Sequence, residues 1–117
     1  MKKEEFVKRT MNFGLRMIRL VNSLPKQQVA QVLGNQLLRA RTSVGANYRA
    51  AIRGKSRADF IAKMGIVEEE CDEALYWMEM LIESGIVKPD LLKDLKDEGN
   101  QILAIVVASI RTARRNK

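Results

Sequence analysis

Residues 56–85 read SRADFIAKMGIVEEECDEALYWMEMLIESG, and this stretch decides the fold. Its apolar side chains recur at spacings of three and four, at Phe60, Met64, Val67, Cys71, Ala74, Met78 and Leu81. This spacing places them on one face of a helix. Ser56 followed by Asp59 is a variant of the capping box that begins a helix, and Gly85 suits the left-handed position beyond its end. We therefore predict a helix over about 57–84.

Turn residues divide the rest of the chain into similar segments. They cluster at 22–25, 53–56 and 84–89, and the two prolines are Pro25 and Pro89. We expect further helices over about 3–23, 27–52 and 90–114. Their core-facing rows are Phe6, Thr10, Phe13, Met17, Leu20 and Leu24; Leu33, Leu37, Ala40, Val44, Asn47 and Ala51; and Leu92, Leu95, Gly99, Ile102, Val106, Ser109 and Ala113. Because the turns are short, neighbouring helices should be antiparallel. The predicted fold is an all-α, up-down-up-down four-helix bundle, with residues 1–117 as one domain.

The turn at 53–56 also predicts how the second and third helices align. Opposite residues should have numbers that sum to about 109, which pairs Arg41 with Glu68 and Arg39 with Glu70. The same register sets Gly45 nearly opposite Gly65. Because glycine in mid-helix is costly, we expect a close approach of the two backbones there. Asn47 in the core-facing row is expected to fix helix register.

The composition disfavours most enzyme classes. The chain has one cysteine, Cys71, and no histidine, which removes zinc sites of Cys and His and every histidine-based catalytic arrangement. The carboxylates at 68–73 fan around their helix, so a salt-bridged face is favoured over a cation site. We predict no enzymatic activity, no metal and no cofactor, and we expect Cys71 to be a core residue.

The sequence also bears on location. No segment approaches the ~18 consecutive apolar residues of a membrane span. The first residues, MKKEEF, lack the apolar stretch of a secretory signal. We expect a cytoplasmic protein with no membrane partner.

Charge is distributed unevenly along the chain. Residues 1–57 hold 13 Lys and Arg against 2 Asp and Glu, residues 58–100 hold 4 against 12, and residues 101–117 hold 4 against none. In the predicted bundle, the start of the first helix, the turn at 53–56 and the end of the last helix meet at one end. That end gathers Lys2, Lys3, Lys8, Arg9, Arg49, Arg53, Lys55, Arg57, Lys63, Arg111, Arg114, Arg115 and Lys117 against Glu4, Glu5 and Asp59. We call it the basic end.

A concentrated basic end is the electrostatic signature of a surface that binds phosphate backbones. The candidate nucleic-acid-binding residues are Lys8, Arg49, Arg53, Lys55, Arg57, Arg111, Arg114 and Arg115. Two alternatives remain open: a solvated end without a ligand, and an acidic protein partner. The arginines of the last helix also complement the negative end of its dipole.

Apolar residues outnumber those that one core-facing row can hold. The first helix adds Val7, Met11, Leu15, Ile18 and Val21, and the last adds Leu91, Leu103, Ile105, Val107 and Ile110. Such a surplus fits either a broad core or a second face that packs against another subunit. Tyr48 and Trp77 fall outside the core-facing rows and are candidate oligomer-interface residues.

The segments 36–47, QLLRARTSVGAN, and 56–61, SRADFI, resemble a known family. Its members are bacterial four-helix-bundle proteins encoded by intervening sequences within 23S ribosomal RNA genes, with relatives among the accessory proteins of diversity-generating retroelements. The resemblance covers almost the whole chain and is strongest at Gln36, Leu37, Arg39, Ser43, Val44, Asn47, Ser56, Phe60 and Glu73. It implies an antiparallel four-helix protomer and a ring-shaped homopentamer without enzymatic activity. Nucleic acid, or a reverse transcriptase in the retroelement branch, is the implied partner.

Together, the residues and the resemblance predict a non-enzymatic, oligomeric module that binds nucleic acid through its basic end, with RNA favoured over DNA. The alternative is a scaffold or adaptor that binds another protein, such as a reverse transcriptase, and touches nucleic acid only incidentally.

Overall fold

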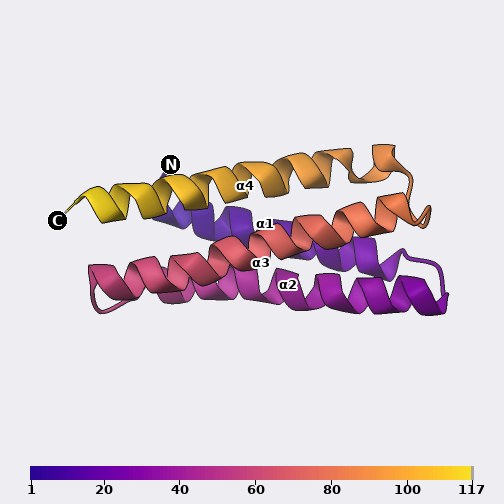
Figure 1. The fold of residues 1–117 in the computed structure, drawn as a ribbon, viewed down its shortest axis with the longest axis horizontal. Helices are drawn as coiled ribbons and strands as arrows, with labels where there is room; N and C mark the ends of the chain where they lie inside the picture. Colours follow the sequence, from indigo (N-terminus) through magenta and orange to yellow (C-terminus); the bar gives the residue numbers. More distant parts are fainter. Residues whose placement is uncertain (117) are drawn as a thin grey trace.

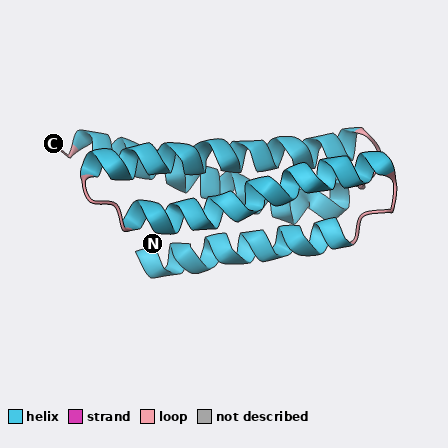
Figure 2. Cartoon of the chain, turned by 90° about the horizontal axis from the view of Figure 1, so that it is seen from below, coloured by secondary structure: helices cyan, strands magenta, loops and turns pink. Residues whose placement is uncertain are grey.

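The computed structural model describes residues 1–116, apart from the side chains of residues 41 and 42. This part of the chain forms helices α1 (Lys3–Asn22), α2 (Gln28–Ile52), α3 (Arg57–Glu83) and α4 (Pro89–Arg115), and it contains no strand. The helices run up, down, up and down in a bundle measuring 49 × 21 × 21 Å (Figures 1 and 2). The four-helix prediction is confirmed, and each boundary lies within one residue of the position expected from the sequence.

Local hydrogen bonds explain where α3 begins and ends. The Ser56 side chain accepts from the backbone N–H of Asp59 at 3.0 Å, and the Asp59 carboxylate accepts from the backbone N–H of Lys55 at 3.2 Å. At the other end, Gly85 takes a φ of 78°. The N–H of Gly85 then bonds to the carbonyl of Ile82, and the N–H of Ile86 to that of Leu81. This is the Schellman arrangement that glycine permits, so both ends of α3 form as predicted.

The core follows the predicted rows closely on α3 and with small shifts elsewhere. Every predicted α3 residue from Met64 to Leu81 is buried. On α2 the prediction was wrong at Asn47, which is half-buried, since Tyr48 occupies the core instead. On α4, Ile110 is buried where Ser109 was expected. In both places the buried position is one residue later than expected. A helix has 3.6 residues per turn, so a strict alternation of three and four gradually leaves the buried face.

The alignment of α2 with α3 agrees with one predicted pair. The Arg39 charge acts on the Glu70 carboxyl, although burial of Glu70 is the larger influence and raises its pKa. The pairing of Arg41 with Glu68 lies outside the described residues.

The expected contact between Gly45 and Gly65 was wrong. Gly45 faces Thr10 of α1, where a Cβ would lie 3.6 Å from the Thr10 hydroxyl. A Cβ on Gly65 would meet nothing within 4 Å. Two glycines at matching heights on neighbouring helices can point in different directions around their axes, so their numbers alone did not establish a close approach.

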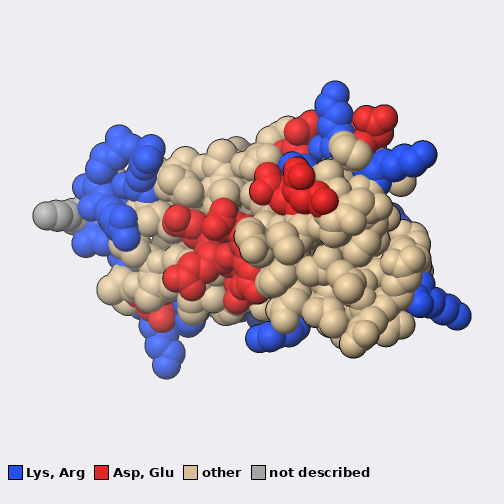
Figure 3. Space-filling view, turned by 45° about the vertical axis from the view of Figure 1, so that its right-hand side comes forward, with Lys and Arg blue, Asp and Glu red and all other residues tan. Residues whose placement is uncertain are grey.

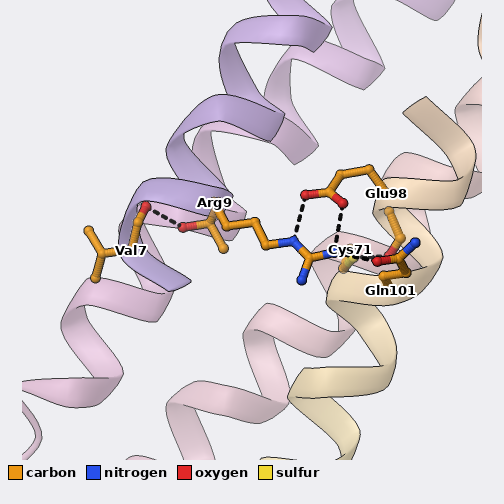
Figure 4. Close-up of polar contacts among 7 residues, drawn as sticks. Val7, Arg9, Cys71, Glu98 and Gln101 are labelled. Carbon is orange, nitrogen blue, oxygen red and sulfur yellow. Dashed lines mark hydrogen bonds and ion pairs between the residues drawn. The ribbon is translucent and has the colours of Figure 1, made fainter. Parts of the chain in front are cut away.

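Helices α1 and α4 are tied together near the middle of the bundle. Arg9 donates from Nε and Nη2 to the two carboxylate oxygens of Glu98, each at 2.7 Å, and also to Gln101 at 2.6 Å (Figure 4). Beside this clamp, Gly99 leaves room for Phe13 and Leu75, and the Cys71 thiol donates to the Gly99 carbonyl at 3.4 Å.

Away from the clamp, α1 and α4 separate toward the end that holds the α1–α2 and α3–α4 connections (Figure 1). Leu20 and Leu24 were expected in the core but are only half-buried there. No helix within the described residues is long and apolar enough to cross a membrane.

Candidate nucleic-acid interface

The basic end is assembled from three distant segments of sequence. The start of α1, the α2–α3 turn and the end of α4 lie at one end of the bundle, as the topology predicted. Figure 3 shows Lys and Arg side chains gathered at this end, with acidic residues nearer the middle of the same face and a mixture of both charges toward the opposite end. The molecule is therefore electrically polarised along its long axis.

The predicted nucleic-acid-binding residues are all free to meet a ligand. Every one of the eight is exposed: Lys8, Arg49, Arg53, Lys55, Arg57, Arg111, Arg114 and Arg115. None of them forms an ion pair with a carboxylate of residues 1–116. Exposed guanidinium and ammonium groups without a protein anion retain their full charge for an incoming phosphate.

Two cations that the sequence assigned to this end are already used by the protein. Arg9 is held by Glu98, and its side chain is only 22% exposed. This hydrogen bond with Glu98 raises the pKa of Arg9. Lys63 donates to Asp59 at 2.9 Å. Lys117 lies outside the described residues, so the binding surface consists of the remaining exposed cations.

Asp59 is a carboxylate at the basic end, and it accepts hydrogen bonds from Lys63 and from the backbone N–H of Lys55 at the start of α3. The hydrogen bond from Lys63 and the backbone N–H of Lys55 lower the pKa of the Asp59 carboxyl. Asp59 therefore carries its negative charge at neutral pH, where it fixes the α2–α3 turn that presents Arg53, Lys55 and Arg57.

The two candidate oligomer-interface residues, Tyr48 and Trp77, differ in how far they are buried. Tyr48 was placed outside the core-facing row, which was wrong: it is 6% exposed and packs edge-on against Phe6 with ring centroids 4.7 Å apart. Burial, with a smaller effect of the Glu4 charge, raises the pKa of Tyr48. Trp77 is half-buried, and its Nε1 donates to Glu73 at 3.2 Å. Trp77 also packs edge-on against Tyr76, which is 54% exposed.

Sequence reasoning missed a groove between α1 and α2 that begins at the basic end. It has a volume of about 260 Å³ and is lined by Val7, Thr10, Met11, Gly14, Leu15, Ile18, Gly45, Ala46 and Arg49. Met11 and Leu15, two of the surplus apolar residues, are 52% and 41% exposed along it. Three small residues line this groove, Gly14 on α1 and Gly45 and Ala46 on α2. They were the signal in the sequence, since they leave the space that larger side chains would fill.

The carboxylates of the described residues do not converge on one point. Within the described residues, no group of three or more Asp, Glu, Cys or His side chains comes close enough to hold a metal ion.

Comparison with known proteins supplies the relatives of this chain. Residues 2–108 match the family model of the 23S rRNA-intervening sequence protein. The chain is also similar to a crystal structure from Bacteroides thetaiotaomicron, a protein of unknown function from the S23 ribosomal protein family. The identity is 32%, the TM-score is 0.87, and the match covers 95% of this chain and 99% of that one. No curated protein matches the sequence.

Proposed function

The chain belongs to the family of the 23S rRNA-intervening sequence proteins, and on that premise we propose that it is a non-enzymatic, oligomeric module that binds nucleic acid, RNA in preference to DNA, through its basic end. The observation that carries the proposal is the convergence of three sequence segments on one end, with eight cations exposed and unpaired within the described chain. We place it in the cytoplasm.

The kind of contact follows from the residue types at this end. Arginine and lysine bind phosphate oxygens through charge and hydrogen bonds, and such contacts position a protein on nucleic acid without reading sequence. The aromatic rings at this end are not free to stack on bases: Phe6 and Tyr48 are buried, and Phe60 is half-buried against the core. Tyr76 and Trp77 lie in the last third of α3, toward the opposite end. The proposed binding should therefore weaken strongly as the salt concentration rises and should depend little on nucleic-acid sequence.

Oligomerisation is supported by apolar surface that the single chain leaves uncovered. The α1–α2 groove exposes Met11 and Leu15, and on α3 the side chains of Ile66 and Tyr76 are 43% and 54% exposed. The groove residues form one apolar surface, and such a patch on a small soluble domain commonly marks a protein interface. We propose a ring of identical subunits, with five as the expected number, which would repeat the basic end around the assembly.

The test is the salt dependence of RNA binding. The log of the association constant falls with the log of the salt concentration, with a slope of about −0.7 per neutralised phosphate on single strands. Replacing Arg53, Lys55 and Arg57 by Gln should flatten this slope for a fluorescently labelled single-stranded RNA, as measured by anisotropy. Replacing Arg111, Arg114 and Arg115 should do the same.

A matched control changes the same amount of charge at the opposite end. The variant with Arg16, Arg19 and Lys88 replaced by Gln should keep the slope of the parent. Equal losses from both ends would indicate diffuse attraction to a cationic protein. Absence of RNA and DNA binding at low salt would reject the proposal and favour the adaptor alternative.

A further inference from the structure

The opening between α1 and α4 is a second surface, at the end opposite the basic end. It is a cleft of about 900 Å³ with an apolar floor, formed where Val87, Leu92 and Leu95 are almost fully buried. Leu20 and Leu24 of α1 form one wall and are half-buried. We call it the α1–α4 cleft.

The cleft exists because α1 and α4 are held together near mid-bundle but not at the end that carries the α1–α2 and α3–α4 connections. The Arg9–Glu98 clamp and the packing of Phe13 against Gly99 hold the helices together near mid-bundle. From Leu95 toward the start of α4, the described residues form no hydrogen bond or ion pair between α1 and α4. Leu91, at the first turn of α4, is 73% exposed. An exposed leucine beside an apolar floor is a site that another apolar surface would cover.

The charges around the cleft define the partner. Arg16, Arg19 and Lys88 line it, and Asp90 is the one carboxylate among its described lining residues. An occupant that combines apolar side chains with flanking carboxylates would therefore be complementary to both the floor and the rim.

The backbone requirements of the occupant favour a helix. The cleft is lined by α1, by α4 and by the α1–α2 and α3–α4 connections. The described part of the chain contains no strand, so the cleft offers no strand edge with which an extended peptide could pair its backbone. A helix satisfies its own backbone and presents apolar residues at i, i+3, i+4 and i+7. The helical part of this wall, from Arg16 to Asn22, is about 9 Å long at 1.5 Å per residue, which matches between one and two turns of a guest helix.

We propose that the α1–α4 cleft binds an acidic amphipathic helix of a partner protein. No aromatic residue lines it on which a base could stack. The site is separate from the basic end, so this proposal does not depend on nucleic-acid binding.

The experiment uses a designed probe. A fluorescein-labelled peptide of about 18 residues, long enough to be partly helical, carries leucines at i, i+3, i+4 and i+7 and glutamates on both flanks. Its twin has lysines in place of the glutamates. Fluorescence anisotropy with the full chain should give saturable binding of the glutamate peptide and binding of the lysine peptide weaker by roughly tenfold or more, because three attractive charge contacts become repulsive.

Variants locate the binding on the protein. Leu91→Glu and Arg19→Glu should each weaken the glutamate peptide by about tenfold. Leu91 and Arg19 are exposed, so neither change should unfold the bundle. Val29→Glu is the matched control, because Val29 is 57% exposed on α2 and outside the cleft. It should leave the affinity unchanged.

Three results would overturn the proposal. One is failure of the glutamate peptide to bind, and another is loss of binding in the Arg53, Lys55 and Arg57 variant, which would move the site to the basic end. The third is a fall in the mass of the free protein on Leu91→Glu, measured by light scattering, because a second copy would then be the occupant.

Discussion

Cys71 illustrates how the core controls the chemistry of a single residue. Its side chain is fully buried and donates to the Gly99 carbonyl, and burial, helped by the Asp72 charge, raises the pKa of the thiol to about 12. The thiolate is the reactive form. We expect native protein at pH 8 to resist a thiol reagent such as DTNB, and denatured protein to react at once. Rapid reaction of the native state would contradict the buried placement.

The same thiol gives a direction to stability at alkaline pH. Because the folded-state pKa is raised from its usual value of 9.0, folding favours the neutral thiol. That contribution is complete below pH 9 and is lost as the pH rises toward 12. A Cys71→Ser variant offers no clean control because its hydroxyl is harder to bury, so Cys71→Ala is the comparison: its melting temperature should fall less steeply above pH 9.

Gly65 and Gly99 make opposite predictions for one substitution. A methyl group on Gly65 would meet nothing within 4 Å, so Gly65→Ala should stabilise the helix by about 1 kcal/mol and raise the melting temperature by a few degrees. On Gly99 the methyl carbon would lie 2.8 Å from a Leu75 methyl and 3.2 Å from the Phe13 ring. Gly99→Ala should therefore destabilise the protein. Thermal melts of both variants test the two environments, and a lower melting temperature for Gly65→Ala would contradict the open space.

At the scale of the element, the cap of α3 should be worth more than its exposure suggests. The Ser56 hydroxyl satisfies one backbone N–H at the start of a 27-residue helix. Ser56→Ala should cost about 1 kcal/mol in the free energy of unfolding, measured by urea titration. Ser23→Ala is a suitable control, because the Ser23 hydroxyl bonds only to the carbonyl of Leu20 at the end of α1. Equal costs for the two changes would show that capping is not the reason.

Sequence patterns predicted the elements well because helix propensity, turns and periodicity are local. Ser56 and Gly85 each act through a few neighbouring residues, and each is found in its predicted role. Pro89, assigned to the turn before the last helix, is the first residue of α4. The direction in which a side chain points around the axis is less local. Tyr48 entered the core in place of Asn47 because it meets Phe6 of α1, and nothing within α2 itself specifies that partner.

At the scale of the whole molecule, the exposed apolar groove predicts assembly. Light scattering of the purified chain should give a mass well above 13.3 kDa, with about five times that value expected for the ring. Met11→Glu should lower the mass, since it places a charge in the α1–α2 groove, whereas Val29→Glu outside the groove should not. A parent protein that is monomeric at micromolar concentration would reject the oligomer.

The candidate site could be predicted from the sequence in outline only. Topology was enough to bring Lys8, Arg53 and Arg111 to one end, because antiparallel helices of similar length must align their termini. It could not show that Arg9 donates to Glu98. That contact joins two residues 89 positions apart in the sequence and depends on the directions of their side chains around α1 and α4. The α1–α4 cleft was missed for the same reason: Leu20 and Leu24 have the correct spacing for a core that does not close over them.

The length of the bundle has a consequence for how its two ends communicate. Electric fields in physiological salt fade over about 8 Å, while the molecule is 49 Å long. A ligand that neutralises one end therefore leaves the potential at the other unchanged. Coupling between the two ends would therefore have to pass through the packing of the helices, where the Arg9–Glu98 contact joins α1 to α4.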